Sequence, residues 1–145
     1  MTTFEIIQSA TSILTTLGVG IAAYQLFLTK RGAQSDFEDS FSEQYRSIVA
    51  DLPLKALLGQ SLTDQEIEAS LRTFYNYFDL CNEQAFLAAR GRLDSKTWAN
   101  WREGIEQQMR RPAFVEAWRR LRPQLDGSFD DFRALLPISE RSFKN

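Results

Sequence analysis

The sequence predicts an all-α protein in which an N-terminal transmembrane helix precedes an antiparallel helical bundle. Along most of the chain, apolar residues recur every three or four positions, which is the period of an amphipathic helix. Residues that cap helices stand where these segments begin, and glycine or proline stands where they end. No alternating run of useful length indicates a β-strand, and Asp126-Gly127 lies between helical patterns rather than between β-branched runs.

The composition is that of one globular domain with a short extra element. The chain has 145 residues, of which 43% are hydrophobic and 25% are charged. A net charge of −2 provides no general attraction to nucleic acid. We expect residues 1–31 to hold the transmembrane helix and its flanks, residues 32–137 to form the cytoplasmic helical bundle, and residues 138–145 to be a tail.

The 23 residues from Ile6 to Leu28 contain no charged side chain, and their length suits a bilayer core of about 30 Å. Lys30 and Arg31 follow this run, so the positive-inside rule predicts an outside N-terminus and a bundle on the cytoplasmic side of the inner membrane. The run differs from a signal peptide because it lacks a basic start and a small-residue cleavage site. A soluble helix that packs into the bundle or onto a partner is the alternative.

One side of this N-terminal helix carries small and hydrogen-bonding residues at heptad spacing. The residues of this oligomer seam are Gln8, Thr11, Thr15, Gly18, Ala22 and Gln25. In lipid, small residues let helices approach closely, and polar side chains form hydrogen bonds between helices. The seam therefore predicts a homo-oligomer in membrane lipid, and the same side could line a wet pore.

A short linker at residues 29–34 is expected after the transmembrane helix. Ser35 and Glu38 then match a capping box that would start a second amphipathic helix. Pro53 would end this helix, and Gly59 would stop the short helical turn that follows.

The longest helical pattern begins at Thr63, which forms a capping box with Glu66. It ends at Gly91, after the basic Arg90. Its apolar side consists of Ile67, Leu71, Phe74, Phe78, Cys81 and Ala85. This side is wide enough for a helix at the centre of a bundle. Because the only cysteine lies on it, we expect a buried thiol and no disulfide.

The opposite side of this central helix carries a polar stripe. Its members are Arg72, Asn76, Asp79 and Glu83. A solvated face is the ordinary interpretation of such a stripe, and a polar site or a contact with another subunit is the alternative. Two carboxylates from one helix are too few ligands for a hard-cation site, so no metal is predicted.

Three shorter helices complete the predicted bundle. Asp94 is a favourable N-cap, and Trp98 and Trp101 follow it at a spacing that would pack them back against the central helix. Pro112 suits the first turn of the next helix, and Ser128 is expected to cap the last one.

Five arginines gather in the C-terminal third of the chain. This basic patch comprises Arg110, Arg111, Arg119, Arg120 and Arg122. It could contact anionic lipid headgroups, an RNA backbone or the acidic 36–43 stretch of a neighbouring subunit. A protein or lipid contact is favoured over nucleic acid, because the interleaved Trp118 lies on an apolar helix side and is expected in the core rather than under a stacked base.

The chain contains no histidine, which removes the usual general base and histidine-activated nucleophiles. It also removes histidine-ligated zinc, and a single cysteine cannot build a thiolate site. No glycine-rich phosphate loop is present. The sequence therefore predicts a protein that is not an enzyme and that needs no cofactor.

The stretch FYNYFDLCNEQAFLAARGRLDSKTWANW, followed by REGI and RRPAFVEAW, resembles a family of small uncharacterised bacterial proteins. The resemblance covers Ser35 to Leu136 and is best from Arg72 to Trp118. It implies one N-terminal membrane segment and a helical domain of unknown function. The layout is also loosely similar to that of the membrane-anchored accessory proteins of type VI-B CRISPR systems, which carry a divergent helical nuclease-like domain and assemble into membrane rings.

These resemblances imply an accessory or effector protein of antiviral defence, with a protein from the same operon as its partner. Helical nucleases of that kind need an arginine and a histidine on one helix. Arg72 and Asn76 match the start of such a motif, but no histidine can complete it. The alternatives are a soluble helical interaction module and a degenerate nuclease-like domain that binds RNA.

Overall fold

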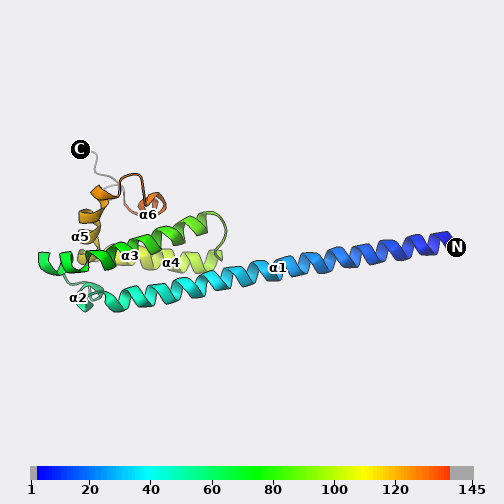
Figure 1. The fold of residues 1–145 in the computed structure, drawn as a ribbon, viewed down its shortest axis with the longest axis horizontal. Coiled ribbons are helices and arrows are strands. Elements are labelled where there is room, and N and C mark those ends of the chain that lie inside the picture. The colour runs from blue at the N-terminus through cyan, green and yellow to red at the C-terminus, as the bar shows by residue number, and fades with distance from the viewer. Residues whose placement is uncertain (1–2, 138–145) are drawn as a thin grey trace. The chain divides into compact units, whose positions relative to one another are not determined.

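The computed structural model of the chain describes the backbone of residues 3–137 and the side chains of residues 19–137. This part of the chain is all-helical, as predicted, and contains no strand (Figure 1). Its elements are α1 (Thr3–Asp51), α2 (Leu54–Leu57), α3 (Asp64–Ala89), α4 (Ser95–Gln108), α5 (Pro112–Leu121), the 3₁₀ helix η1 (Arg122–Gln124) and α6 (Asp130–Leu135). The internal contacts divide the chain into two units, Met1–Asp36 and Phe37–Asn145. The predicted tail at 138–145 lies outside the described residues.

Helix α1 runs without interruption through the segment that was expected to be a linker. The predictions of a linker at 29–34 and of a new helix capped by Ser35 are therefore wrong. A single glycine such as Gly32 costs a helix only about 1 kcal/mol relative to alanine, which the flanking helix-forming residues can offset. The helix ends at Asp51, where Pro53 prevents its continuation.

Both predicted ends of the central helix are confirmed in α3. The Thr63 hydroxyl accepts a hydrogen bond from the Glu66 N–H at 3.2 Å, and the Thr63 N–H donates to the Glu66 carboxylate at 2.8 Å. At the other end Gly91 has a φ of 65°, which favours glycine because it has no Cβ. The 26 residues of α3 are thus bounded by local sequence signals alone.

An aromatic cluster joins α3 to α5 and α6. The ring centroid of Phe78 on α3 lies 5.3 Å from that of Trp118 on α5, and Trp118 lies 5.0 Å from Phe132 on α6. Phe74 meets Phe114 edge to face at 5.2 Å. All five rings are fully buried, so their apolar burial stabilises the packing of these three helices.

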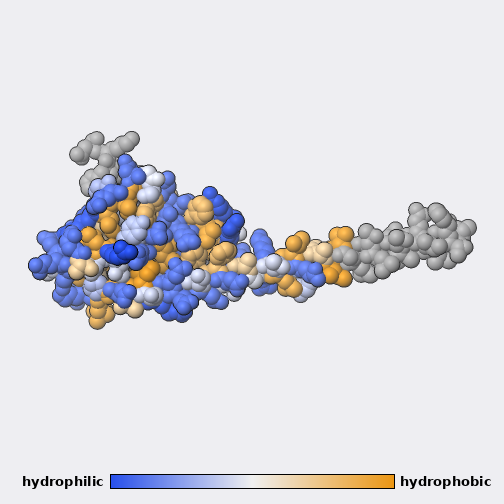
Figure 2. All heavy atoms as spheres, viewed as in Figure 1, coloured by the Kyte–Doolittle hydropathy of each residue, from blue (hydrophilic) through white to orange (hydrophobic). Residues whose placement is uncertain are grey.

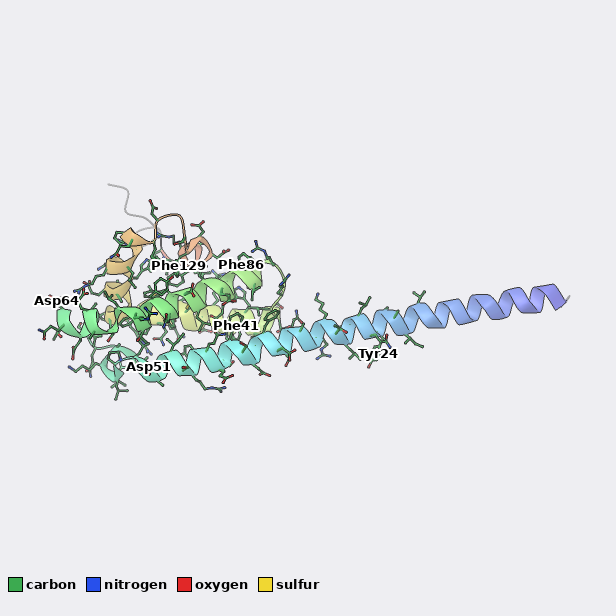
Figure 3. The ribbon with its side chains drawn as sticks, in the orientation of Figure 1. Tyr24, Phe41, Asp51, Asp64, Phe86 and Phe129 are labelled. Atoms are coloured by element: carbon green, nitrogen blue, oxygen red, sulfur yellow. The ribbon has the colours of Figure 1, made fainter. Side chains whose placement is uncertain are left out.

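A second apolar cluster joins α3 to α4 and to the part of α1 that belongs to the second unit. Its buried members are Phe41, Leu80, Leu87 and Leu93. Trp98 and Trp101 of α4 pack against it, as predicted, but both are only partly buried. Phe41, labelled in Figure 3, meets Trp101 edge to face at 5.8 Å.

The start of α6 differs from the prediction. The N-cap is Phe129, which has a φ of 61°, and its side chain makes no capping hydrogen bond. The Ser128 hydroxyl instead donates to the Leu125 carbonyl at 3.0 Å. The capping acceptor comes from α3, where the Asn82 side-chain oxygen accepts the Phe132 N–H at 3.0 Å. The prediction that Ser128 caps this helix is wrong because a tertiary contact has taken its place.

Candidate functional site

The first unit presents large apolar side chains to solvent on consecutive turns of α1. Figure 2 shows hydrophobic residues along this described part of the helix. The exposed fractions are 65% for Val19, 59% for Ile21, 63% for Tyr24, 72% for Leu26, 54% for Phe27 and 48% for Leu28. Leaving such side chains in water forgoes roughly 1.5–3 kcal/mol for each one that could be fully buried. This run therefore needs a covering environment.

Among the described residues, no helix is both long enough and apolar enough to cross a membrane. The uncharged run from Ile6 to Leu28 falls largely before residue 19, where side chains are not described. Four residues of the oligomer seam, Gln8, Thr11, Thr15 and Gly18, likewise lie outside the described residues. Ala22 and Gln25 are described, and both are exposed.

The polar stripe of α3 is exposed to solvent along its length. Asn76, Asp79 and Glu83 line a shallow hollow of about 310 Å³ whose other wall includes Gln44 of α1. Arg72 does not line this hollow. In the described part of the chain, no group of three or more Asp, Glu or Cys residues could hold a metal ion. The structure thus brings three of the four stripe residues together on an open, hydrated surface.

The five arginines of the basic patch do not share one environment. Arg110 and Arg119 are exposed, whereas Arg122 is buried. Arg111 is half-buried at the start of α5 and lines a cavity described below. The patch is therefore divided among a solvent-facing pair, a buried residue and side chains that face other parts of the bundle.

Arg120 is occupied by a network of carboxylates rather than directed to solvent. Its guanidinium donates to Glu116 at 3.0 Å, to Glu68 at 2.9 Å and also to Asp64. These hydrogen bonds, that to Glu116 first, raise the pKa of the Arg120 guanidinium further above its ordinary value. Because Asp64 and Glu68 belong to α3, the network ties the first turn of α3 to the last turn of α5.

A cavity of about 450 Å³ opens between α3, α4 and the C-terminal part of α1. Its α1 wall includes Phe41, and its α4 wall includes Trp101 and Gly104. The buried amides of Gln84 and Gln108 face it, with exposed fractions of 6% and 8%. Its size lies within the range of small-molecule sites in proteins.

Cys81 and Tyr77 line this cavity, and both are buried. Burial raises the pKa of the Cys81 thiol from 9.0 to about 12, so the buried, protonated thiol expected from the sequence is confirmed. Burial also raises the pKa of the Tyr77 hydroxyl well above 10.0, and the neighbouring Cys81 raises it further. Both groups are neutral near pH 7, which makes them hydrogen-bonding partners rather than nucleophiles.

Sequence patterns singled out Cys81, Trp101 and Arg111, but not the cavity that they line or its other polar residues. Gln84 and Gln108 interrupt otherwise apolar helix sides, and Gly104 lies within a helical pattern where glycine is unfavourable. Each of these was a weak signal of a special position. Their convergence depends on how α3 and α4 pack, which no local pattern contains.

The fold and these sites define a helical protein with an exposed apolar segment on α1, an exposed polar stripe on α3 and a cavity lined by amides and aromatic rings. Comparison of the chain with protein-family models, with curated proteins and with solved structures gives no match.

Proposed function

We propose that the chain is a membrane-anchored helical protein that self-associates in the bacterial inner membrane and acts by assembly rather than by catalysis. The observation that carries this proposal is the exposure of the large apolar side chains from Val19 to Leu28 on α1. A helix run that carries no charged side chain suits lipid, which needs no charged outer face. Lys30 and Arg31 at the end of the run support a cytoplasmic bundle.

The oligomer seam supports self-association. In lipid, the aliphatic side of a helix gains little from contact with protein, whereas small and polar residues do gain from it. Each interhelical hydrogen bond there is worth only about 0.6 kcal/mol, so an assembly needs the contact to be repeated around a closed ring. The exposed Ala22 and Gln25 are consistent with such a contact.

An accessory or effector role in antiviral defence is the concrete form of this proposal, and a pore is one way in which it could act. The layout resemblance supports it, and so does the absence of histidine from the sequence, which leaves assembly as the simpler mode of action. A partner protein from the same operon fits this role.

Membrane fractionation tests the anchor. The full chain should sediment with membranes and resist alkaline carbonate, and the double variant Ile21→Asp, Leu26→Asp should move to the soluble fraction. An aspartate opposes insertion by about 2.5–3.5 kcal/mol at the centre of a spanning helix, and by less near its end, where Leu26 lies. A matched control is Leu54→Asp with Leu58→Asp, because these leucines are exposed by 68% and 64% and lie outside α1.

The control variant should stay in the membrane fraction. Recovery of the unaltered chain from the soluble fraction as a monodisperse monomer would show that the membrane proposal is wrong and would favour a soluble interaction module. If the aspartate pair in α1 does not change fractionation, the anchor lies elsewhere in the chain.

Cross-linking in membranes tests the assembly. Thr15→Leu combined with Gly18→Leu makes the seam bulky and apolar while leaving the segment able to insert. We expect fewer cross-linked oligomers than for the unaltered chain. Oligomers at unchanged abundance would mean that the bundle, and not the N-terminal helix, holds the copies together.

A further inference from the structure

The cavity between α1, α3 and α4 contains a buried hydrogen-bond acceptor that no other group satisfies. The side-chain oxygen of Gln108 is inaccessible to solvent and has no hydrogen-bond partner among the described residues. The neighbouring Gln84 is equally buried and lines the same cavity. An unsatisfied buried polar group is destabilising, so native proteins rarely keep one without a reason. A ligand in the cavity would supply that reason.

The charge of the cavity lining is positive. Arg46 and Arg111 line it, and no aspartate or glutamate does so in the described part of the chain. Neither arginine forms an ion pair with any described residue, in contrast to Arg120. Two guanidinium groups without carboxylate partners favour an anion, and their planar donor geometry suits a phosphate.

The apolar part of the lining is aromatic. Trp101 is only partly buried, and its ring is nearly perpendicular to that of Phe41 in a T-shaped contact. An indole whose position is set by a neighbouring ring is a platform on which a flat ring can stack. The cavity thus combines a stacking surface, two primary amides and two cationic groups.

Gly104 lies on the cavity lining and is itself exposed. It stands in the interior of α4, where glycine is less favourable than alanine. No close approach of another element requires it, because a Cβ at this position would meet nothing within 4 Å. We expect a larger side chain at this position of the lining to compete with a ligand for the same space.

We propose that this cavity binds a nucleotide, with the base between Trp101 and the amides of Gln84 and Gln108 and the phosphate at Arg46 and Arg111. A primary amide both donates and accepts, which matches the edge of a nucleobase. A lipid chain would leave the two amides unsatisfied, and free phosphate would leave the aromatic wall uncovered. This inference goes beyond the proposed membrane role and does not depend on it.

Titration of the full chain with adenosine and guanosine monophosphate tests the proposal, with tryptophan fluorescence and calorimetry as readouts. At least one monophosphate should bind. Its nucleoside, which lacks the phosphate, and inorganic phosphate, which lacks the base, should each bind at least about tenfold more weakly. Failure of both monophosphates to bind would overturn the proposal. So would equal binding of inorganic phosphate, or binding of an RNA oligomer alone.

Two variants locate the site. Gly104→Leu adds an apolar side chain to the cavity lining at a position where a Cβ meets nothing within 4 Å, and it improves helix propensity. We expect it to abolish nucleotide binding without lowering the melting temperature. The matched control is Ala99→Leu, at an exposed position of α4 outside the cavity, which should bind normally.

Gln108→Leu removes the unsatisfied acceptor, and it should weaken binding by roughly tenfold while leaving the fold intact. Nucleotide binding that persists unchanged in both the Gly104→Leu and the Gln108→Leu variants would show that the ligand binds elsewhere, which would overturn the assignment of this cavity.

Discussion

Apolar residues of the same kinds have opposite surroundings in the two units of the chain. On α3, Phe74 and Phe78 have an exposed fraction of 0%, whereas on α1 Phe27 and Leu26 are exposed by 54% and 72%. In α3 the apolar residues share one side and charged residues the other, which is the pattern of a helix between a core and water. In the first unit the apolar residues have no charged residue opposite them from Ile6 to Leu28. The difference shows that hydrophobicity alone does not determine whether a side chain is buried within the chain.

Charge shows the same contrast. In the second unit, ion pairs link the elements, for example Lys55 with Glu66 at 3.0 Å and the Arg120 network between α3 and α5. The exposed ion pair of Lys55 contributes little by itself, because water screens it.

The largest expected effect comes from deleting a core ring and comparing it with an equally apolar residue of α1. Trp118→Ala should lower the free energy of unfolding by about 3–5 kcal/mol, because Trp118 is fully buried. Leu26→Ala should leave the unfolding of the bundle unchanged within about 0.5 kcal/mol. Urea unfolding of the full chain, followed by near-ultraviolet circular dichroism, measures both. A comparable loss for Leu26→Ala would mean that this part of α1 belongs to the cooperative core.

A smaller loss of stability is expected when the cap of α6 is removed, and it distinguishes the cap from α3, Asn82, from the local candidate, Ser128. Asn82→Ala should cost about 1–2 kcal/mol, because it leaves the Phe132 N–H without its acceptor. Ser128→Ala should cost less than about 0.5 kcal/mol, because the Ser128 hydroxyl is exposed. Urea unfolding measures the loss of stability in both variants. A larger loss for Ser128→Ala than for Asn82→Ala would show that Ser128 is the cap.

Replacing one glycine by alanine in each unit tests whether the backbone there requires glycine. Gly91→Ala should destabilise the bundle by about 1 kcal/mol, because its φ of 65° strains any residue with a Cβ. Gly32→Ala lies in continuous helix where a Cβ meets nothing within 4 Å, and it should raise helix content without lowering the stability of the bundle. Circular dichroism of both variants is the measurement. A loss of helix in Gly32→Ala would indicate a break in α1 at this position.

The smallest effect is a dependence on pH. The Thr63 backbone N–H, with Lys55, holds the pKa of Glu66 below its ordinary value of 4.5. A carboxylate whose pKa is lowered by folding contributes stability above pH 4.5, and this contribution is lost as the pH falls through the lower, folded value. Glu66→Gln should flatten the stability profile below pH 4.5, whereas membrane sedimentation should not change there, because Ile6 to Leu28 contains no titratable carboxylate. An unchanged profile in the variant would assign the acid sensitivity to other carboxylates.

The sequence predicted local features well because their causes are local. The capping box at Thr63, the glycine stop at Gly91 and the N-cap at Asp94, which accepts from the N–H groups of Lys96 and Thr97, each involve residues within a single turn. The Ser35 prediction failed for the opposite reason. A capping motif starts a helix only when the preceding residues leave the helical conformation, and in α1 they remain helical.

The sequence by itself determined the all-helical class, the ends of the central helix and the apolar side that became the core, because hydrogen-bond capping and helical periodicity act over a few residues. Only the tertiary structure decided that Asn82 caps α6, that Arg120 meets the carboxylates of α3, and that two glutamine amides face one cavity beside Trp101. These pairings join residues far apart in the sequence. Their geometry follows from the packing of whole helices, in which each side chain's partner is set by the position of another element.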